Sequence, residues 1–280
     1  MTLKTLCQIL RSFALRNRIM MHDYKHKAKQ NAVNLHWWKL GIQKQNVGDA
    51  LSTVVVEYMM ERTQISSDHS SDNKTKHLFA IGSIIDTTYQ DATVWGSGIL
   101  NGYRTFWWRK LRSLDIRCVR GPETRRVLMA NGFMCPECYG DPAVLMPLIY
   151  NPTLAPSYEQ TCEYKVIRHH SDNSISPNSL SPMTDDYKAF IDELTKCKRV
   201  VSSSLHGIIL AEAYGIPAVL VKHDLNMFKY EDYYHSTGRY TFPIASTVEE
   251  ALEITPAPLP DLKPLQHNLI QSFPVDLWAK

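Results

Sequence analysis

The sequence lacks the features that mark membrane, secreted and nucleic-acid-binding proteins. It has no run of about 18 apolar residues, so no segment is expected to span a membrane. The first thirty residues contain no continuous apolar stretch followed by a small-residue cleavage site, so no secretory signal is expected. The net charge is only +3, well below the balance of a dedicated nucleic-acid binder. We therefore expect a cytoplasmic protein with no nucleic-acid partner.

Cysteine is too sparse for a scaffold held together by disulfides. Six cysteines, at positions 7, 118, 135, 138, 162 and 197, are spread over 280 residues, and a chain of this length buries enough core to fold without disulfides. Cys135 and Cys138 form a CxxC pair, but no second ligand pair at comparable spacing accompanies it in the sequence. The pair is interpreted as part of a loop, and no metal site is predicted.

Length and composition predict two domains of a globular enzyme. Hydrophobic residues make up 44% and charged residues 21% of the chain, and 280 residues exceed the usual size of one compact domain. Residues 151–160 contain two prolines and have the composition of a linker. The boundary is therefore placed there, with an N-terminal domain over 1–150 and a C-terminal domain over 151–280 that ends in a closing helix.

The opening segment, residues 1–33, is strongly basic. Between Lys4 and Lys29 seven basic residues face the single acid Asp23. Apolar residues at helical spacing follow Leu3, which fits either a helix packed on its own domain or one docked on an anionic surface. The second alternative predicts peripheral association with the inner face of a membrane.

Strand and helix patterns alternate along the chain. Apolar segments of the first half end in glycine or polar residues, which predicts a parallel sheet with ligands held at the carboxyl ends of its strands. The predicted strands are 34–38, 77–83, 93–98, 115–119, 164–170, 199–201 and 218–221, and the predicted helices are 50–61, 122–130, 184–197, 208–214, 248–254 and 265–272. Residues 226–240 are aromatic and charged, and we expect them to line a cleft. The fold class is therefore α/β.

The segment Ser202-Ser203-Ser204-Leu205-His206-Gly207 lies directly after a predicted strand and directly before a helix. Backbone N–H groups at a helix N-terminus bind phosphate or carboxylate, and the serine hydroxyls donate further hydrogen bonds. An imidazole at the same turn supplies a proton or a charge. The alternative is that the serines only cap the helix and His206 only orients the loop.

Two further segments fall at predicted strand ends. Asn46, Gly48 and Asp49 open the first helix, where Gly48 allows close approach of a ligand and Asp49 caps the helix or accepts a sugar hydroxyl. Arg120 suits bidentate binding of carboxylate or phosphate, with a surface salt bridge as the alternative.

A pair of histidines follows Arg168 at the end of the first strand of the second domain. Adjacent residues of an extended strand point to opposite faces, so we expect only one of His169 and His170 to face a ligand, and His169 is preferred. The same geometry argues against metal binding by the pair.

Taken in their order along the chain, these sequence segments resemble those of the polysaccharide pyruvyl transferase family. The resemblance rests on Asn46-x-Gly48-Asp49, the Gly-Ser strand ends at 82–83 and 96–97, Val119-Arg120-Gly121-Pro122-Glu123-Thr124, Gly140-Asp141-Pro142-Ala143, Ser203-Ser204-Leu205-His206-Gly207 and Lys229-Tyr230-x-Asp232-Tyr233-Tyr234. It runs from about residue 34 to the end. More narrowly, the chain is similar to members of the family that pyruvylate bacterial exopolysaccharide and capsule units. Where some members carry arginine before the leucine, this chain has Ser204.

The resemblance implies two Rossmann-like domains facing a cleft, similar to B-type glycosyltransferases. It implies phosphoenolpyruvate as co-substrate, no further cofactor, and a sugar acceptor on a lipid carrier or a nucleotide, whose hydroxyl pair becomes a cyclic ketal. The residues that match and would hold the donor are Arg120, Arg168, His169, Ser203, Ser204, Gly207 and Lys229. Asn46, Gly48 and Tyr233 are the candidates for acceptor binding.

The chemistry of such a transfer assigns roles to three residues. A general acid must protonate the enol carbon, and a base must take the proton of an attacking hydroxyl. His206 is the candidate acid or phosphate ligand, and Asp49 or Asp232 is the candidate base. Two alternatives remain at this point, a nucleotide-sugar-dependent glycosyltransferase of the same two-domain type and a non-catalytic polymer-binding protein that uses the aromatic stretch 228–240.

Overall fold

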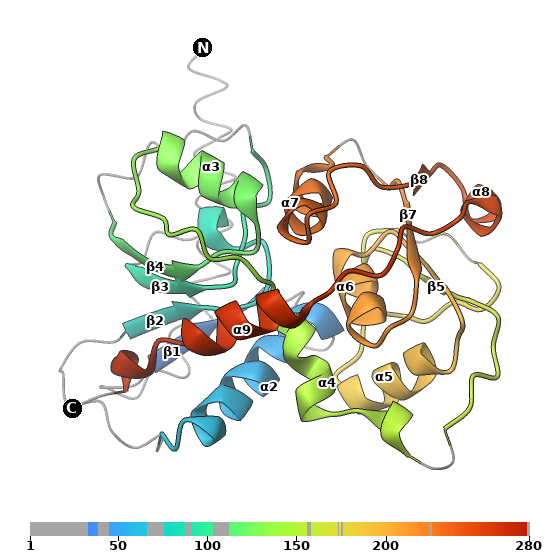
Figure 1. Ribbon diagram of the computed structural model, residues 1–280, viewed down its shortest axis with the longest axis horizontal. Helices are drawn as coiled ribbons and strands as arrows, with labels where there is room; N and C mark the ends of the chain where they lie inside the picture. Colours follow the sequence, from blue (N-terminus) through green and yellow to red (C-terminus); the bar gives the residue numbers. More distant parts are fainter. Residues whose placement is uncertain are drawn as a thin grey trace.

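The computed structural model describes residues 33–38, 45–65, 76–87, 91–102, 112–155, 158–172, 174, 176–223 and 226–278. The basic segment and its predicted membrane contact lie outside these residues, except for Val33. Two sheets organise the described chain (Figure 1). In the described parts of the chain, no helix has both the length and the apolar character needed to cross a membrane.

Each sheet has four parallel strands in chain order. The first contains β1 (Val33–His36), β2 (Lys76–Phe79), β3 (Ala92–Trp95) and β4 (Leu114–Cys118), and the second contains β5 (Lys165–Ile167), β6 (Val200–Ser202), β7 (Ala218–Val221) and β8 (Ile244–Ala245). Strands β3 and β7 are buried along their whole length, as expected for apolar strands covered on both faces. The predicted α/β class with two Rossmann-like domains is confirmed.

Helices connect and cover these strands. They are α2 (Val47–Arg62), α3 (Pro122–Ala130), α4 (Met146–Ile149), α5 (Tyr187–Thr195), α6 (Leu205–Ala213), α7 (Phe228–Ser236), α8 (Val248–Glu253) and α9 (Lys263–Gln271), with short 3-10 turns η1 (Ile85–Thr87), η3 (Pro142–Leu145), η4 (Pro152–Leu154) and η5 (Val275–Leu277). Pro122 occupies the first position of α3. Proline suits this position because a backbone N–H there would have no hydrogen-bond acceptor within the helix. Gly215 follows α6 with a φ of +74°, the left-handed conformation that favours glycine.

The structure differs from the sequence predictions at one helix start and in one segment. Helix α6 begins at Leu205, so His206 and Gly207 belong to its first turn instead of preceding it. Most of residues 226–240 form helix α7, which was not predicted as a helix and which packs against α3; that this segment lines a cleft stays a prediction. The aromatic side chains of α7 are buried at Phe228, Tyr230, Tyr233 and Tyr234.

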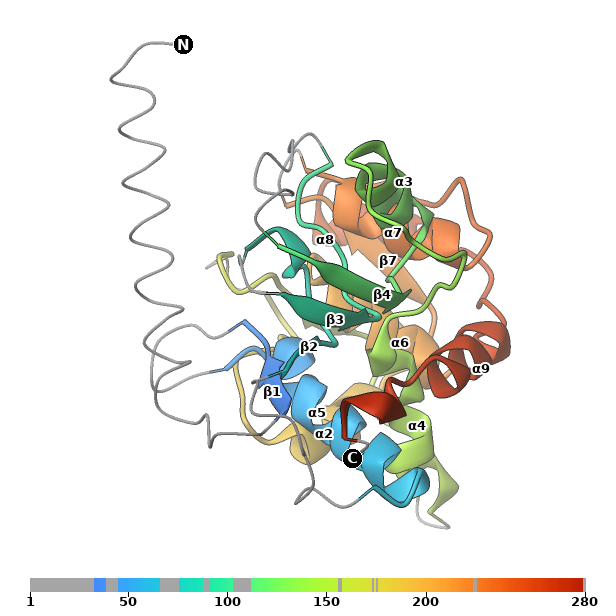
Figure 2. The same ribbon diagram turned by 90° about the vertical axis from the view of Figure 1, so that its left-hand side faces the viewer.

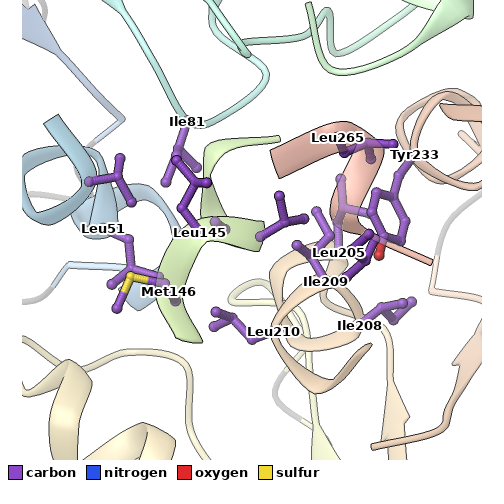
Figure 3. Packing of buried hydrophobic residues seen from close by; sticks show 14 of the residues in the cluster. Leu51, Ile81, Leu145, Met146, Leu205, Ile208, Ile209, Leu210, Tyr233 and Leu265 are labelled. Atoms are coloured by element: carbon purple, nitrogen blue, oxygen red, sulfur yellow. The ribbon is translucent and has the colours of Figure 1, made fainter. Parts of the chain in front are cut away.

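One hydrophobic core joins the two sheets. Leu51 of α2 and Ile81 beyond β2 share a cluster with Leu205 and Ile209 of α6, and Leu145 of η3 lies between them. Figure 3 shows these side chains meeting around the η3–α4 segment, with Leu265 of α9 on the same cluster. The region between the two sheets is therefore filled by packed hydrophobic side chains.

The last helix returns to the first sheet. Trp95 Nε1 of β3 donates a hydrogen bond of 2.9 Å to the carbonyl of Leu269 in α9. Beyond α9, Asp276 pairs with Arg117 of β4 at 2.8 Å, and Phe273 packs edge-on against Trp95. In Figures 1 and 2 α9 passes from the second sheet toward the C-terminus beneath the first. The helix expected to close the C-terminal domain thus also fastens the two sheets together, while the boundary at residue 151 stays a prediction.

Candidate active site

Helices α2 and α6 start next to each other, one from each predicted domain. Asn46 caps α2, because its side chain accepts a hydrogen bond of 3.0 Å from the N–H of Gly48. A Cβ on Gly48 would lie 2.1 Å from Cγ and Nδ1 of His206, which stands in the first turn of α6. Only glycine allows this approach, and it brings the two predicted ligand-binding turns into direct contact.

Asp49 lies in the first turn of α2 beside this contact. A Cβ on Gly82, where φ is +109°, would come within 2.7 Å of Asp49 Oδ1. Burial raises the pKa of Asp49 to about 6, while His206 and Lys229 pull it down and Asp141 pushes it up. A carboxyl with such a pKa exchanges protons near neutral pH, as an acid–base catalyst must.

His206 is held between Gly48 and Asp141. Its Nε2 lies 3.8 Å from Asp141 Oδ2, an ion-pair separation longer than a hydrogen bond, and neither atom has a hydrogen-bond partner in the described structure. Burial lowers the pKa of His206, but Asp141 and Asp49 outweigh it and raise that pKa above its usual value. The imidazole is therefore biased toward its charged form, which suits an anion.

The α6 N-terminus itself is uncapped. Ser204 precedes the helix, and its side chain makes no capping hydrogen bond. Ser202 Oγ instead donates to the carbonyl of Ile167 at 2.8 Å and accepts from the N–H of Ser204. Gly207 packs on this turn, since its Cβ would lie 2.5 Å from Ser202 Oγ. The first-turn N–H groups are thus left for an anion.

Ser203 and Lys229 complete one side of this region. Ser203 Oγ accepts a hydrogen bond of 2.9 Å from the N–H of His169, and its carbonyl accepts one of 2.7 Å from the hydroxyl of Tyr230. Lys229, mostly buried on α7, lies with Nζ 4.9 Å from the centre of the Tyr230 ring. Its charge depresses the pKa values of both Asp49 and His169, so it stands near both. We call Asp49, Asp141, Ser204, His206 and Lys229 the boundary site.

Arg120, just before α3, and Asp232 of α7 form a buried ion pair. Arg120 Nε donates to Asp232 Oδ2 at 3.0 Å, and both side chains are almost completely buried. The guanidinium also binds the hydroxyl of Ser83 and the carbonyl of Ile99. Asp232 accepts two more hydrogen bonds, from the N–H and hydroxyl of Thr124 at the start of α3. The two residues bind each other, and the charge of Arg120 also lowers the pKa of His206.

Arg168 and Tyr233 are also occupied elsewhere. Arg168 binds Asp172 at 2.8 Å and Ser176 within its own loop. Tyr233 is completely buried, and its hydroxyl donates to Glu212 Oε2 at 2.7 Å. No surface of Tyr233 reaches solvent here, and its contact with an acceptor sugar stays a prediction.

Sequence reasoning missed two features of the site. Asp141, in the segment Gly140-Asp141-Pro142-Ala143, was given no predicted role, because only folding brings it to His206. His170 was expected to face away from His169; β5 ends at Ile167, however, and the two rings lie 4.1 Å apart. Within the described ranges no group of three or more His, Cys, Asp or Glu side chains is arranged to hold a metal ion.

Two known proteins are similar to this chain in sequence. The chain is 27% identical to protein L143 of Acanthamoeba polyphaga mimivirus, which is uncharacterized, over 65% of this chain and 66% of that protein. It is 30% identical to the succinoglycan biosynthesis protein ExoV of Rhizobium meliloti over 44% of this chain and 41% of that one. The chain thus spans less than two thirds of the length of either relative.

A solved structure and a family model complete the comparison. Protein KP1_0663 of Klebsiella pneumoniae subsp. pneumoniae NTUH-K2044, uncharacterized in function, matches with a TM-score of 0.47 and 14% identity over 80% of this chain and 93% of that one. The model for polysaccharide pyruvyl transferase matches residues 77–224. That range holds β2 to β7, the Arg120 turn and the α6 N-terminus, more than half of the 280 residues. The chain therefore belongs to the polysaccharide pyruvyl transferase family.

Proposed function

We propose that this protein transfers a pyruvyl group from phosphoenolpyruvate to two hydroxyls of a sugar, forming a cyclic ketal in exopolysaccharide or capsule biosynthesis. One observation carries the proposal: the N-terminus of α6, which lacks a side-chain cap and contains Ser204 and His206, lies next to Asp49 of helix α2, a carboxyl of raised pKa. The relative named for succinoglycan biosynthesis supports the polysaccharide context.

The donor fits the charge of the boundary site. Phosphoenolpyruvate carries a phosphate and a carboxylate, so its site needs several N–H donors and cations. The first turn of α6 supplies backbone N–H groups, His206 is biased toward its charged form, and Lys229 adds an ammonium. His169 and Ser203, joined by a hydrogen bond, extend the same surface. Arg120 and Arg168 contribute to the positive field but are bound to carboxylates of their own.

The reaction needs one acid and one base. Protonation of the enol methylene carbon gives an oxocarbenium-like centre, and the first sugar hydroxyl adds to it as it loses its proton to the base. The second hydroxyl then displaces the phosphate, which takes up the proton of that hydroxyl, so the products are the ketal and inorganic phosphate. The negative charge of the donor carboxylate and of the departing phosphate is stabilised by fixed donors and cations.

Asp49 and His206 are the pair we assign to these steps. Above its pKa of about 6, Asp49 is mostly ionised and accepts the proton of the hydroxyl. His206, whose pKa is raised, supplies the proton or binds the leaving phosphate. Asp232 is the weaker candidate base, because both of its oxygens already accept hydrogen bonds from Arg120 and Thr124. Asn46 and Gly48 act on the acceptor side by shaping the start of α2.

The acceptor is proposed to be a sugar on a lipid carrier or a nucleotide, reached from the cytoplasmic side of a membrane. An acceptor screen tests this directly. The protein is incubated with phosphoenolpyruvate and candidate glycosides, and released phosphate and pyruvylated product are measured together. Phosphate release that depends on a sugar diol and gives a ketal supports the proposal; equal release with sugars whose hydroxyl pair is blocked would contradict it.

Ligand-dependent stabilisation separates this function from glycosyl transfer. A ligand that binds only the folded protein raises its melting temperature. We expect phosphoenolpyruvate to raise it in the wild type but not in His206→Ala, with His267→Ala, an exposed histidine on α9, as matched control. Stabilisation by UDP, GDP or a nucleotide sugar in place of phosphoenolpyruvate would move the assignment to a glycosyltransferase.

A further inference from the structure

The two ring nitrogens of His206 face different parts of the boundary site. Nε2 is buried, and Asp141 Oδ2 lies 3.8 Å from it. Nδ1 lies over the start of α2, because a Cβ on Gly48 would come within 2.1 Å of that nitrogen. Neither nitrogen has a hydrogen-bond partner within the described chain. One nitrogen is therefore turned to a carboxylate, and the other is turned to the place where the starts of α2 and α6 meet.

Asp141 is held in place by its own segment. Its Oδ1 accepts a hydrogen bond of 3.1 Å from the N–H of Ala143 and so caps the 3-10 turn η3, which packs against both α2 and α6. The preceding residue, Gly140, donates its N–H to the carbonyl of Val119 at 3.0 Å. Asp141 is completely buried, and among the described groups Oδ2 has no hydrogen-bond donor. One carboxyl oxygen is thus engaged by the turn, and the other faces His206.

The chemistry of this contact decides where the imidazole proton lies. A carboxylate accepts hydrogen bonds and donates none, so an Nε2 lone pair opposite Asp141 Oδ2 would place two acceptors against each other, away from water. A proton on Nε2 removes this conflict. The separation of 3.8 Å is longer than a hydrogen bond, and such contacts often shorten when a ligand enters a catalytic site. The proton that His206 gains or loses is then the one on Nδ1.

Charged groups from several elements surround the His206 ring. Asp141, before η3, and Asp49, on α2, bring negative charge to it, and Arg120, before α3, brings positive charge. Lys229 of α7 acts on Asp49. Among the described groups, only the Asp141 carboxylate is close enough to a ring nitrogen of His206 to form an ion pair with it. Asp141 is therefore the group placed to determine which nitrogen carries the proton.

We propose that Asp141 is a positioning residue, which keeps a proton on Nε2 of His206 and thereby directs Nδ1 to the substrate. In this arrangement Nδ1 accepts a proton when the ring is neutral and donates one when the ring is charged, while the proton on Nε2 stays in place. A buried carboxylate that fixes the tautomer and the orientation of an imidazole has the same function in the Ser-His-Asp triad. The use of Nδ1 in catalysis rests on the proposed function, whereas the position of the proton does not.

Nuclear magnetic resonance of the histidine ring nitrogens in the full chain measures the tautomer without any ligand. The His206 signal is the one that is lost in His206→Gln. At a pH where the ring is neutral, we expect hydrogen on Nε2 in the wild type. In Asp141→Asn the amide oxygen can still accept from Ala143, so its NH2 group faces Nε2 and the hydrogen should move to Nδ1. Asp185→Asn makes the same change at an exposed carboxylate, and this matched control should leave the ring as in the wild type.

The position of the ring hydrogen in the two proteins supports or overturns the tautomer. Hydrogen on Nε2 in the wild type that moves to Nδ1 in Asp141→Asn supports it. Hydrogen on Nδ1 in the wild type, or the same tautomer in both proteins, would overturn it. Should Asp141→Asn fail to fold, the wild-type spectrum decides alone, since Nε2–H agrees with the proposal and Nδ1–H contradicts it.

Turnover tests whether the tautomer matters for catalysis. In Asp141→Asn the neutral ring would present N–H at Nδ1 where the wild type presents a lone pair, so we expect kcat for ketal formation to fall at least about a hundredfold and its pH dependence to change. Asp185→Asn should keep wild-type turnover. Wild-type kcat and pH dependence in Asp141→Asn would overturn the positioning role. A protein whose His206 tautomer depends on Asp141 but which forms no ketal with any acceptor fails only the proposed function.

Discussion

Asp49 and Asp232 both lie where the two sheets meet, yet their surroundings differ. Asp232 accepts hydrogen bonds from Arg120 and from two groups of Thr124, at 2.6–3.0 Å, and is completely buried. Asp49 accepts no hydrogen bond within the described chain, remains partly exposed, and has a pKa raised to about 6. A carboxylate whose oxygens are all engaged holds structure, whereas one that lacks donors is available to a substrate.

Removing Asp232 should give the largest effect on stability. Asp232→Ala leaves the Arg120 guanidinium buried without its counter-charge, and breaking a buried pair in this way costs about 3–5 kcal/mol. Urea unfolding measures the loss. Asp276→Ala, which removes an exposed partner of Arg117, is the control and should cost less than about 1 kcal/mol. A folded, fully stable Asp232→Ala protein that has lost turnover would instead make Asp232 a catalytic base.

Gly48→Ala tests the contact between the two helix starts. The new Cβ would lie 2.1 Å from the His206 ring, so helix or ring must move, and overpacking of this kind costs up to about 3 kcal/mol. We expect loss of turnover and of stabilisation by phosphoenolpyruvate as well. Gly215→Ala is the control, because nothing lies within 4 Å of its Cβ and only its φ of +74° opposes the change, at about 1 kcal/mol. Equal activity in both variants would show that this contact does not position the site.

Asp49→Asn should change how stability depends on pH. Because the folded-state pKa of about 6 is above the ordinary 3.8, Asp49 contributes stability that is fully present below pH 3.8 and is lost as pH rises through 6. The variant lacks this loss, so from pH 4.5 to pH 8 its stability should gain about 2 kcal/mol on the wild type. Chemical denaturation at both pH values measures it, with exposed Asp185→Asn as control. If the free energy of unfolding depended on pH in the same way in the wild type and in Asp49→Asn, Asp49 would be solvated and its pKa would not be raised.

Tyr233→Phe should have the smallest effect. The change removes one hydrogen bond to Glu212, which keeps its two contacts with Arg239, so the expected cost is about 1 kcal/mol. Since Tyr233 is completely buried, the KM for an acceptor sugar should not change. Tyr240→Phe, at an exposed ring, controls for loss of a hydroxyl at the surface. A raised acceptor KM without loss of stability would return Tyr233 to the acceptor site.

Much of the fold could be predicted from local pattern. Helix α3 and strand β7 have the predicted bounds, because proline at a helix start and an apolar β-branched run each act within a few residues. Helix α7 was missed as a helix, since its mixture of aromatic and charged residues shows no clear helical face until α3 packs on it. The strand-to-helix turn before α6 was predicted in the right place, but the start of the helix lies three residues earlier than predicted, at Leu205.

Residue types and their order along the chain determine which groups stand at strand ends. The sequence predicts that position for Gly48, Asp49, Arg120, Ser204 and His206. Only the tertiary structure decided which of these side chains bind another side chain and which remain available to a ligand. Arg120 is bound by Asp232, more than a hundred residues away, while His206 meets Asp141 and Gly48. Burial and pairing set the pKa and availability of a side chain, and both arise from contacts between distant segments that no local pattern encodes.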